Sequence, residues 1–163
     1  MRALLVGGGR PGLELTRRLT ADGHAVRFVT RNEAFVPEIR EAGGEAYIGD
    51  PDRIGSLRYA LDNVTVLLWL LGPVPDADLH GSRLEMMMER TIDTTVRGMV
   101  YEGPPAGVAI VERMAGYNEI PYAILETPRE DAGAWVSAVL AAIDGVLAAP
   151  RETARVSPES PKS

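Results

Sequence analysis

The sequence has no cysteine and only two histidines, His24 and His80. Without a thiol the chain can form neither a disulfide nor a cysteine-ligated metal site, and thiol catalysis is excluded. Two histidines far apart in the sequence are also a poor basis for a zinc site. We therefore expect no metal centre, and function has to rest on other groups.

Lysine is nearly absent, because sixteen of the 17 basic residues are arginines and the only lysine is Lys162. An excess of positive charge is lacking as well, since the formal net charge is −6. Nucleic-acid-binding surfaces bind phosphates through clustered positive charge. We therefore expect no nucleic-acid partner.

Long apolar runs are missing too, and no window approaches the roughly 18 residues of a membrane span. The N-terminus, MRALLVGGG, has an apolar run too short for a signal peptide. These features predict a cytoplasmic protein without membrane association. The 163 residues, 45% hydrophobic and 25% charged, suit one globular domain. We place that domain at 1–149 and expect 150–163, which is rich in breakers and poor in apolar residues, to be a disordered tail.

Short apolar runs alternate with segments of helical spacing along the chain. The expected strands are 3–6, 24–30, 45–49, 64–71, 96–101 and 120–125. The expected helices are about 13–21, 33–42, 53–61, 79–93, 107–116 and 130–148. Six such units predict a doubly wound α/β fold of the Rossmann type, with a parallel sheet in the order 3-2-1-4-5-6 and helices on both faces.

A glycine-rich turn lies between the first expected strand and helix. Its residues match G-x-G-x-x-G, in which Gly7 permits the tight turn, Gly9 leaves room for a pyrophosphate and Gly12 lets the helix pack closely. The helix N-terminus would also offer N–H groups and a positive dipole end to phosphates. The sequence therefore predicts dinucleotide binding, with contacts from Gly7, Gly9, Arg10, Pro11, Gly12 and Leu13.

The end of the second strand bears on which dinucleotide is bound. NAD sites place an acid there for the ribose 2′-hydroxyl, whereas an arginine accommodates the 2′-phosphate of NADP. This chain has Thr30-Arg31-Asn32, which favours NADP(H) over NAD(H), and Arg10 could approach the same phosphate. Two alternatives stay open: Arg31 is a solvated surface residue, or Glu33 acts as the missing acid.

The segments VGGGRPG, GHAVRFVTRN, GGEAYIGDPD, VTVLLWLLG and VERMAGYNEIPYAILETP resemble atypical short-chain dehydrogenases of the NmrA-like and epimerase-like type. The glycine spacing departs from the usual G-x-x-G-x-x-G of these relatives, because Val6 occupies the first position. The resemblance implies that Asp50 faces the adenine and that Leu71 and Gly72 line the ribose. Asp50 is equally well placed to be a turn residue before Pro51.

The catalytic residues of active short-chain dehydrogenases are missing. Those enzymes use a serine or threonine after the fifth strand and a Tyr-x-x-x-Lys pair, in which the lysine lowers the pKa of the tyrosine. Here Glu102-Gly103 stands in place of the hydroxyl residue. Tyr117 has Pro121 four residues later, and it is better interpreted as a core or capping aromatic.

Other groups could still serve the chemistry. Tyr101 and Glu102 end a strand next to the switch point, where ligands bind in open α/β sheets, so Glu102 is either a proton carrier or a solvated or capping carboxylate. His80 has no evident partner. Met86–Met88 suggest core filling or a subunit contact, which leaves a homo-oligomer open, and Glu112-Arg113 suggests a surface pair or an interface.

The sequence thus favours an NADP(H)-binding oxidoreductase without the Tyr-Lys pair. Since hydride transfer belongs to the cofactor, an acceptor such as a quinone or flavin would need no strong acid from the protein. A non-catalytic NADP(H) sensor or a regulatory or assembly subunit is the alternative. An S-adenosylmethionine-dependent methyltransferase is more remote, because that class also needs an acid at the end of the second strand.

Overall fold

The structure is a computed structural model that describes residues 1–149. Six parallel strands form one sheet in the order β3-β2-β1-β4-β5-β6, which confirms the predicted fold class and order. The strands are β1 (Arg2–Gly7), β2 (Ala25–Thr30), β3 (Glu45–Ile48), β4 (Val66–Leu70), β5 (Met99–Glu102) and β6 (Tyr122–Ile124). The expected tail at 150–163 lies outside the described residues.

Helices follow the strands in alternation. The α-helices are α1 (Gly9–Ala21), α2 (Val36–Glu41), α3 (Ser82–Thr91), α4 (Pro105–Tyr117) and α5 (Ala132–Ala148). Three short 3₁₀ helices complete the described chain: η1 (Glu33–Phe35), η2 (Ile54–Leu57) and η3 (Ala77–His80). No helix within residues 1–149 combines the length and the apolar character that a membrane span requires.

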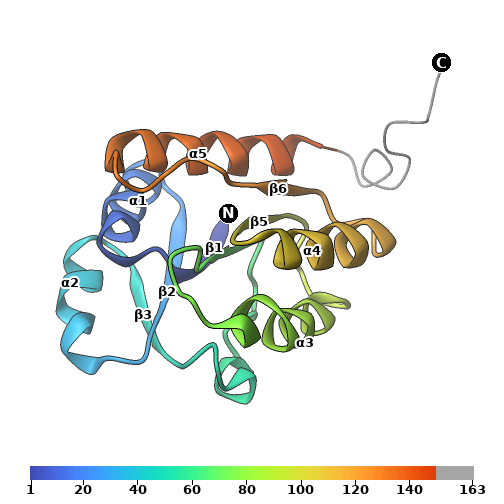
Figure 1. The fold of residues 1–163 in the computed structure, drawn as a ribbon. Coiled ribbons are helices and arrows are strands. Elements are labelled where there is room, and N and C mark those ends of the chain that lie inside the picture. Colours follow the sequence, from blue (N-terminus) through green and yellow to red (C-terminus); the bar gives the residue numbers. More distant parts are fainter. Residues whose placement is uncertain (150–163) are drawn as a thin grey trace.

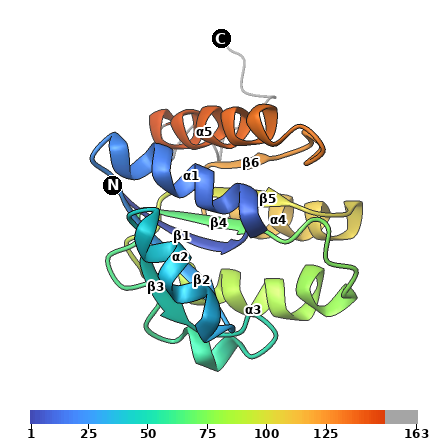
Figure 2. The ribbon, with the colours of Figure 1, turned by 90° about the vertical axis from the view of Figure 1, so that its left-hand side faces the viewer.

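The sheet lies between two layers of helices (Figure 1). Helices α1 and α5 pack side by side over one face, and α3 and α4 cover the other, as the rotated view also shows (Figure 2). Alternate residues of β1 enter different cores: Leu4 and Val6 pack with the α3 and α4 side, whereas Ala3 and Leu5 pack with the α1 and α5 side. This is why the central strands are continuous apolar runs without polar alternation.

Two helix predictions were wrong. The expected helix at 53–61 contains only the short η2, because the side chain of Ser56 donates to the backbone oxygens of Asp50 and Arg53 and holds the segment in a turn. The expected helix at 79–93 is divided at Gly81, whose backbone is not helical and which separates η3 from α3. A Cβ at Gly81 would lie only 2.9 Å from the carbonyl oxygen of Ala77.

The chain reverses its direction of winding between β1 and β4. After β1 it crosses to α1 on one face, and after β4 it crosses to α3 on the opposite face. The two strands are neighbours in the sheet, so the connections that leave their carboxyl ends diverge. Such a switch point is where ligands bind in open α/β sheets, and it is occupied here by the glycine turn.

Candidate functional site

The glycine turn is fixed against the end of β4. Gly7 has φ +89°, and a Cβ there would collide with the carbonyl oxygen of Leu70, so this position requires glycine. Gly8 also has a positive φ, and its amide donates to the Leu70 oxygen at 2.9 Å. Helix α1 starts directly after it, and no side chain among the described residues caps that N-terminus. The first turn of α1 therefore presents free N–H groups at the switch point.

Gly9 and Gly12 have different surroundings. A Cβ at Gly12 would lie 3.2–3.3 Å from Phe28 and Leu5, so this glycine brings α1 close to the sheet. A Cβ at Gly9 would meet no backbone atom within 4 Å, and its nearest neighbours would be Nη1 of Arg129 at 3.7 Å and the Pro11 ring at 3.9 Å. A side chain at Gly9 would thus come into van der Waals contact with the Arg129 guanidinium, which lies directly beside the turn.

A pocket of about 310 Å³ adjoins the turn at the ends of β1, β2 and β3. We call it the glycine-turn pocket. Of the residues expected from the sequence, it is lined by Gly7, Gly9, Thr30, Arg31, Asp50 and Leu71. It also includes residues that the sequence analysis did not single out: Val6, Phe28, Val29, Phe35, Gly49, Pro51, Asp52, Val74, Asp76 and Leu79. Residues from the ends of the first three strands and from the segment after β4 thus line one concave surface with apolar walls.

The remaining residues expected at the cofactor lie around this pocket and do not line it. Arg10 points to Glu38, with an Nη1–Oε1 distance of 2.6 Å, and Asn32 accepts from the Ala34 amide to cap η1. Glu33, the alternative acid, is exposed and does not line the pocket. The others occupy neighbouring positions in the chain: Pro11, Gly12 and Leu13 in α1 and Gly72 after β4.

Arg31 and Asp50 give the pocket its polar end. The Arg31 side chain is 77% exposed, and its Nη1 lies 3.9 Å from Oδ2 of Asp50. Oδ1 of Asp50 accepts from the amide of Asp52 at 2.9 Å, so Asp50 forms the turn that the sequence suggested while its other oxygen faces Arg31. Asp52 pairs with Arg83 at 3.4 Å. The guanidinium of Arg31 is thus the exposed and weakly held cation of this pocket.

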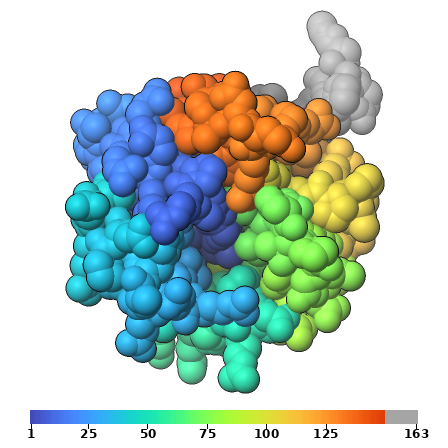
Figure 3. Space-filling model, turned by 60° about the vertical axis from the view of Figure 1, so that its left-hand side comes forward, coloured from blue at the N-terminus to red at the C-terminus, as the bar shows by residue number. Residues whose placement is uncertain are grey.

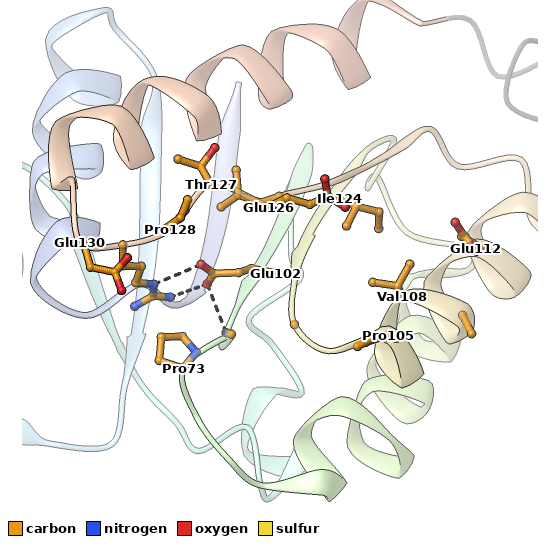
Figure 4. A pocket seen from close by; sticks show the side chains of 15 residues that line it. Pro73, Glu102, Pro105, Val108, Glu112, Ile124, Glu126, Thr127, Pro128 and Glu130 are labelled. Atoms are coloured by element: carbon orange, nitrogen blue, oxygen red, sulfur yellow. Dashed lines mark hydrogen bonds and ion pairs between the residues drawn. The ribbon is translucent and has the colours of Figure 1, made fainter.

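A second, larger pocket of about 1010 Å³ lies beyond the ends of β4, β5 and β6. We call it the β5–β6 pocket. Figure 4 shows Glu112 and Glu130 at its opposite ends, with Val108, Ile124 and Pro128 between them. Gly72, which follows the glycine-turn pocket residue Leu71 in the chain, lines this second pocket. The two pockets are thus lined by consecutive residues just after β4, although they share no lining residue.

Glu102 is held by four donors at the floor of the β5–β6 pocket. Its carboxylate accepts from Nη2 and Nε of Arg129 at 2.6 and 3.3 Å and from the amide of Gly72 at 3.2 Å (Figure 4). It also accepts from Nε1 of Trp135 at 2.9 Å. The residue is 8% exposed. A carboxylate with this many partners is a structural anchor between β4, β5 and the segment leading into α5. Its interpretation as a solvated group was wrong.

Arg129 was missed by the sequence analysis. It follows β6, and Nη2 donates both to Glu102 and to the carbonyl oxygen of Leu70, the latter at 2.6 Å. Its guanidinium also lies over the ring of Trp135, 4.9 Å from the centroid. The rule that parallel strand ends meet at one edge could have drawn attention to it, since β6 is the neighbour of β5.

Tyr101 and His80 are buried and line neither pocket. The tyrosine hydroxyl lies 2.7 Å from Nδ1 of His80, and Nε2 of His80 lies 3.1 Å from the carbonyl oxygen of Leu71. His80 therefore has partners, contrary to the expectation from the sequence. Burial raises the pKa of Tyr101 well above its ordinary value, so the hydroxyl stays protonated.

Three further side-chain expectations can be compared with the structure. Tyr117 is 87% exposed, so its interpretation as a core or capping aromatic was wrong. Met87 and Met88 are buried core residues, while Met86 is exposed. Arg113 pairs with Glu85 of α3 at 2.9 Å and not with its neighbour in the sequence.

No protein-family model and no curated protein matches the sequence. Solved structures do match. The NADP(H) complex of the triphenylmethane reductase of Citrobacter sp. aligns with a TM-score of 0.62 and 22% identity, over 77% of this chain and 48% of that one. This is the Rossmann fold. Vestitone reductase from alfalfa aligns with a TM-score of 0.63 and 13% identity, over 78% of this chain and 56% of that one.

The present chain spans only about half the length of the triphenylmethane reductase that it matches. A protein of similar size also matches: BdcA from E. coli aligns with a TM-score of 0.64 and 18% identity, over 90% of this chain and 93% of that one. The resemblance to NmrA-like and epimerase-like proteins is thus confirmed at the level of the fold. At these identities the likeness extends to the fold alone.

Proposed function

We propose that this chain binds NADP(H) and acts as an oxidoreductase domain. The observation that carries the proposal is the glycine turn, which opens directly onto a concave pocket at the switch point of the sheet. Phosphates bound there meet the uncapped first turn of α1, where backbone N–H groups and the helix dipole favour anions. The adenosine occupies the glycine-turn pocket, and the nicotinamide extends past Gly72 into the β5–β6 pocket.

NADP(H) is preferred over NAD(H) because of the charges at the polar end. Arg31 is exposed and has one distant carboxylate neighbour, so its guanidinium is free to bind a 2′-phosphate through two hydrogen bonds. Asp50 competes for Arg31 and would accept from a free 2′-hydroxyl, which is the basis of the NAD alternative. The NADP(H) complex of the triphenylmethane reductase, which shares this fold, is consistent with the NADP preference.

The chemistry proposed is hydride transfer without a protein acid. Bound nicotinamide supplies the hydride, and the β5–β6 pocket has room for an acceptor beside it. The side chains at the end of β5 are engaged within the protein and do not offer a proton to an acceptor. Glu102 accepts from four donors, and the hydroxyl of Tyr101 pairs with His80. An acceptor that needs no proton from the protein, such as a quinone or a flavin, fits these groups best.

A second candidate is a non-catalytic NADP(H) sensor. It is supported by Glu102, whose carboxylate is fully hydrogen-bonded within the protein and so is not available for catalysis. Steady-state oxidation of NADPH against quinones, flavins and carbonyl compounds separates the two. We expect turnover with quinones or flavins and none with simple carbonyl compounds. Binding of NADPH without turnover on any of these acceptors would favour the sensor.

A further inference from the structure

We propose that Arg129 binds the pyrophosphate of the dinucleotide, acting as a cation opposite the glycine turn. This inference rests on the proposed function and adds a residue that no dinucleotide motif contains. The guanidinium lines the β5–β6 pocket together with Gly72, donates to the carbonyl oxygen of Leu70 and lies beside Gly9 of the glycine-turn pocket. Figure 3 shows the blue N-terminal segment, the orange segment near residue 130 and the green segment after β4 converging on one face of the molecule.

The hydrogen bonds of Arg129 leave one end of the guanidinium available. Nε and Nη2 are engaged by Glu102 and by the carbonyl oxygen of Leu70. Nη1 has no hydrogen-bond partner among residues 1–149, and it is the atom closest to the space in front of Gly9, at 3.7 Å from an ideal Cβ there. Nη1 is therefore the part of the guanidinium that lies next to the glycine turn and, within the described part of the chain, has no hydrogen bond to give up.

The position of the guanidinium is strongly constrained. The Arg129 side chain is 22% exposed, and it is clamped between the Glu102 carboxylate and the ring of Trp135. Glu102 in turn is fixed by Gly72 and Trp135. A cation held in place before the ligand arrives loses little side-chain freedom on binding, which favours affinity.

The electrostatics of the pair also fit a phosphate ligand. In the free protein, Arg129 is paired with the carboxylate of Glu102. A bound pyrophosphate would bring further negative charge to the glycine turn, and the glycines of the turn have no charged group to balance it. Arg129 would then be shared between Glu102 and the phosphate through opposite edges of its planar guanidinium, a geometry that lysine cannot reproduce. Arg129 therefore acts as a binding residue and Glu102 as its positioning residue.

The test compares NADPH with adenosine 2′-monophosphate, which has the 2′-phosphate but no pyrophosphate. Calorimetry gives the dissociation constant of NADPH, and competition with NADPH gives that of the monophosphate. For Arg129→Ala we expect NADPH to bind about tenfold to a hundredfold more weakly, as for loss of one charged hydrogen bond, and the monophosphate to bind as in the parent. Arg17→Ala, which removes an equal charge from the exposed face of α1, should leave both affinities unchanged.

Removal of Arg129 leaves the Glu102 carboxylate buried without its cation and can prevent folding. The double variant Glu102→Gln with Arg129→Ala removes that charge and should show the same selective loss. Arg129→Lys retains the positive charge next to Glu102 and should show a smaller selective loss.

Three outcomes would count against the inference. Unchanged NADPH affinity in the folded variants, or equal losses for both ligands, would overturn the role of Arg129 and leave the proposed function standing. A parent protein that does not bind NADPH would overturn the proposed function and this inference with it.

Discussion

Arg31 and Asp50 line the same pocket with opposite charges 3.9 Å apart. At the scale of single residues, we propose that this pair decides how the ribose of the cofactor is recognised. A 2′-phosphate would draw Arg31 away from Asp50, whereas a free 2′-hydroxyl would be accepted by Asp50 itself. The balance between them can be shifted by one substitution.

We expect Arg31→Ala to weaken NADP(H) selectively. Loss of a charge-assisted contact costs about 1.5–3 kcal/mol, or about one to two decades in affinity. NAD(H) lacks the 2′-phosphate, so its affinity should not change. Calorimetric titration with both cofactors measures the difference. Arg40→Ala, which removes an exposed arginine from α2, is the matched control. Equal losses for NADPH and NADH would mean that Arg31 does not contact the 2′-phosphate.

Tyr101 gives a second prediction at this scale. Tyr101→Phe removes the hydroxyl that pairs with Nδ1 of His80, and a buried group left unpaired costs about 1–3 kcal/mol. Thermal unfolding should register the loss as a lower Tm, while turnover of NADPH with a quinone persists because the hydroxyl does not reach the pockets. A variant that binds NADPH normally but has lost turnover would identify Tyr101 as an acid.

The pH dependence of this residue follows from its raised pKa. Burial disfavours the tyrosinate, so the folded chain keeps the proton when the unfolded chain loses it above about pH 10. Below that pH Tyr101 is protonated in both states, so it does not make the free energy of unfolding depend on pH. Above that pH the free energy of unfolding falls as the pH rises. Tyr101→Phe should therefore have a shallower alkaline decline in denaturant titrations than the parent. Parallel declines would contradict the raised pKa.

At the scale of elements, the glycine turn and α1 form the unit that was most predictable from the sequence. Local geometry alone determines three signals here: the apolar run, the glycines and the Asp22-Gly23 pair that ends the helix. The structure has β1, the turn and the end of α1 at these positions. Elements that depend on distant partners were less predictable. The segment after β3 became a turn because Ser56 bonds back to Asp50, and periodicity carries no information about that contact.

Gly9→Val tests the turn as an element. The valine side chain would lie against Arg129 and Pro11 on the side of the turn where the phosphates are proposed to lie, while the buried sheet stays intact. We expect the thermal stabilisation by NADPH to vanish; in the parent it amounts to about 2.7 kcal/mol at a hundredfold excess over Kd, or a few degrees in Tm.

The control for this variant must reproduce its backbone strain. Gly9 has φ +56°, so a valine there is strained even without a clash. Gly23 has φ +86°, meets nothing within 4 Å and lies at the other end of α1, so Gly23→Val carries comparable strain away from the pocket. It should lose stability yet keep its response to NADPH. Full stabilisation of folded Gly9→Val by NADPH would contradict binding at the turn.

At the scale of the whole molecule, the sheet collects residues from distant segments at one edge. The order of the strands was predictable from the alternation of elements, and that order brings Gly9, Arg31 and Asp50 to one pocket. The pairing of Glu102 with Arg129 was not predictable, because it joins positions 27 residues apart through side-chain geometry. Sequence patterns indicate which strand ends meet, but not which side chains there engage each other.

The account as a whole depends on NADPH being the ligand of the glycine turn. Calorimetric titration of the purified parent protein with NADPH, NADH and S-adenosylmethionine tests this most directly. We predict saturable binding of one NADPH per chain, weaker binding of NADH and no binding of S-adenosylmethionine. Binding of S-adenosylmethionine with no heat from either dinucleotide would contradict the account.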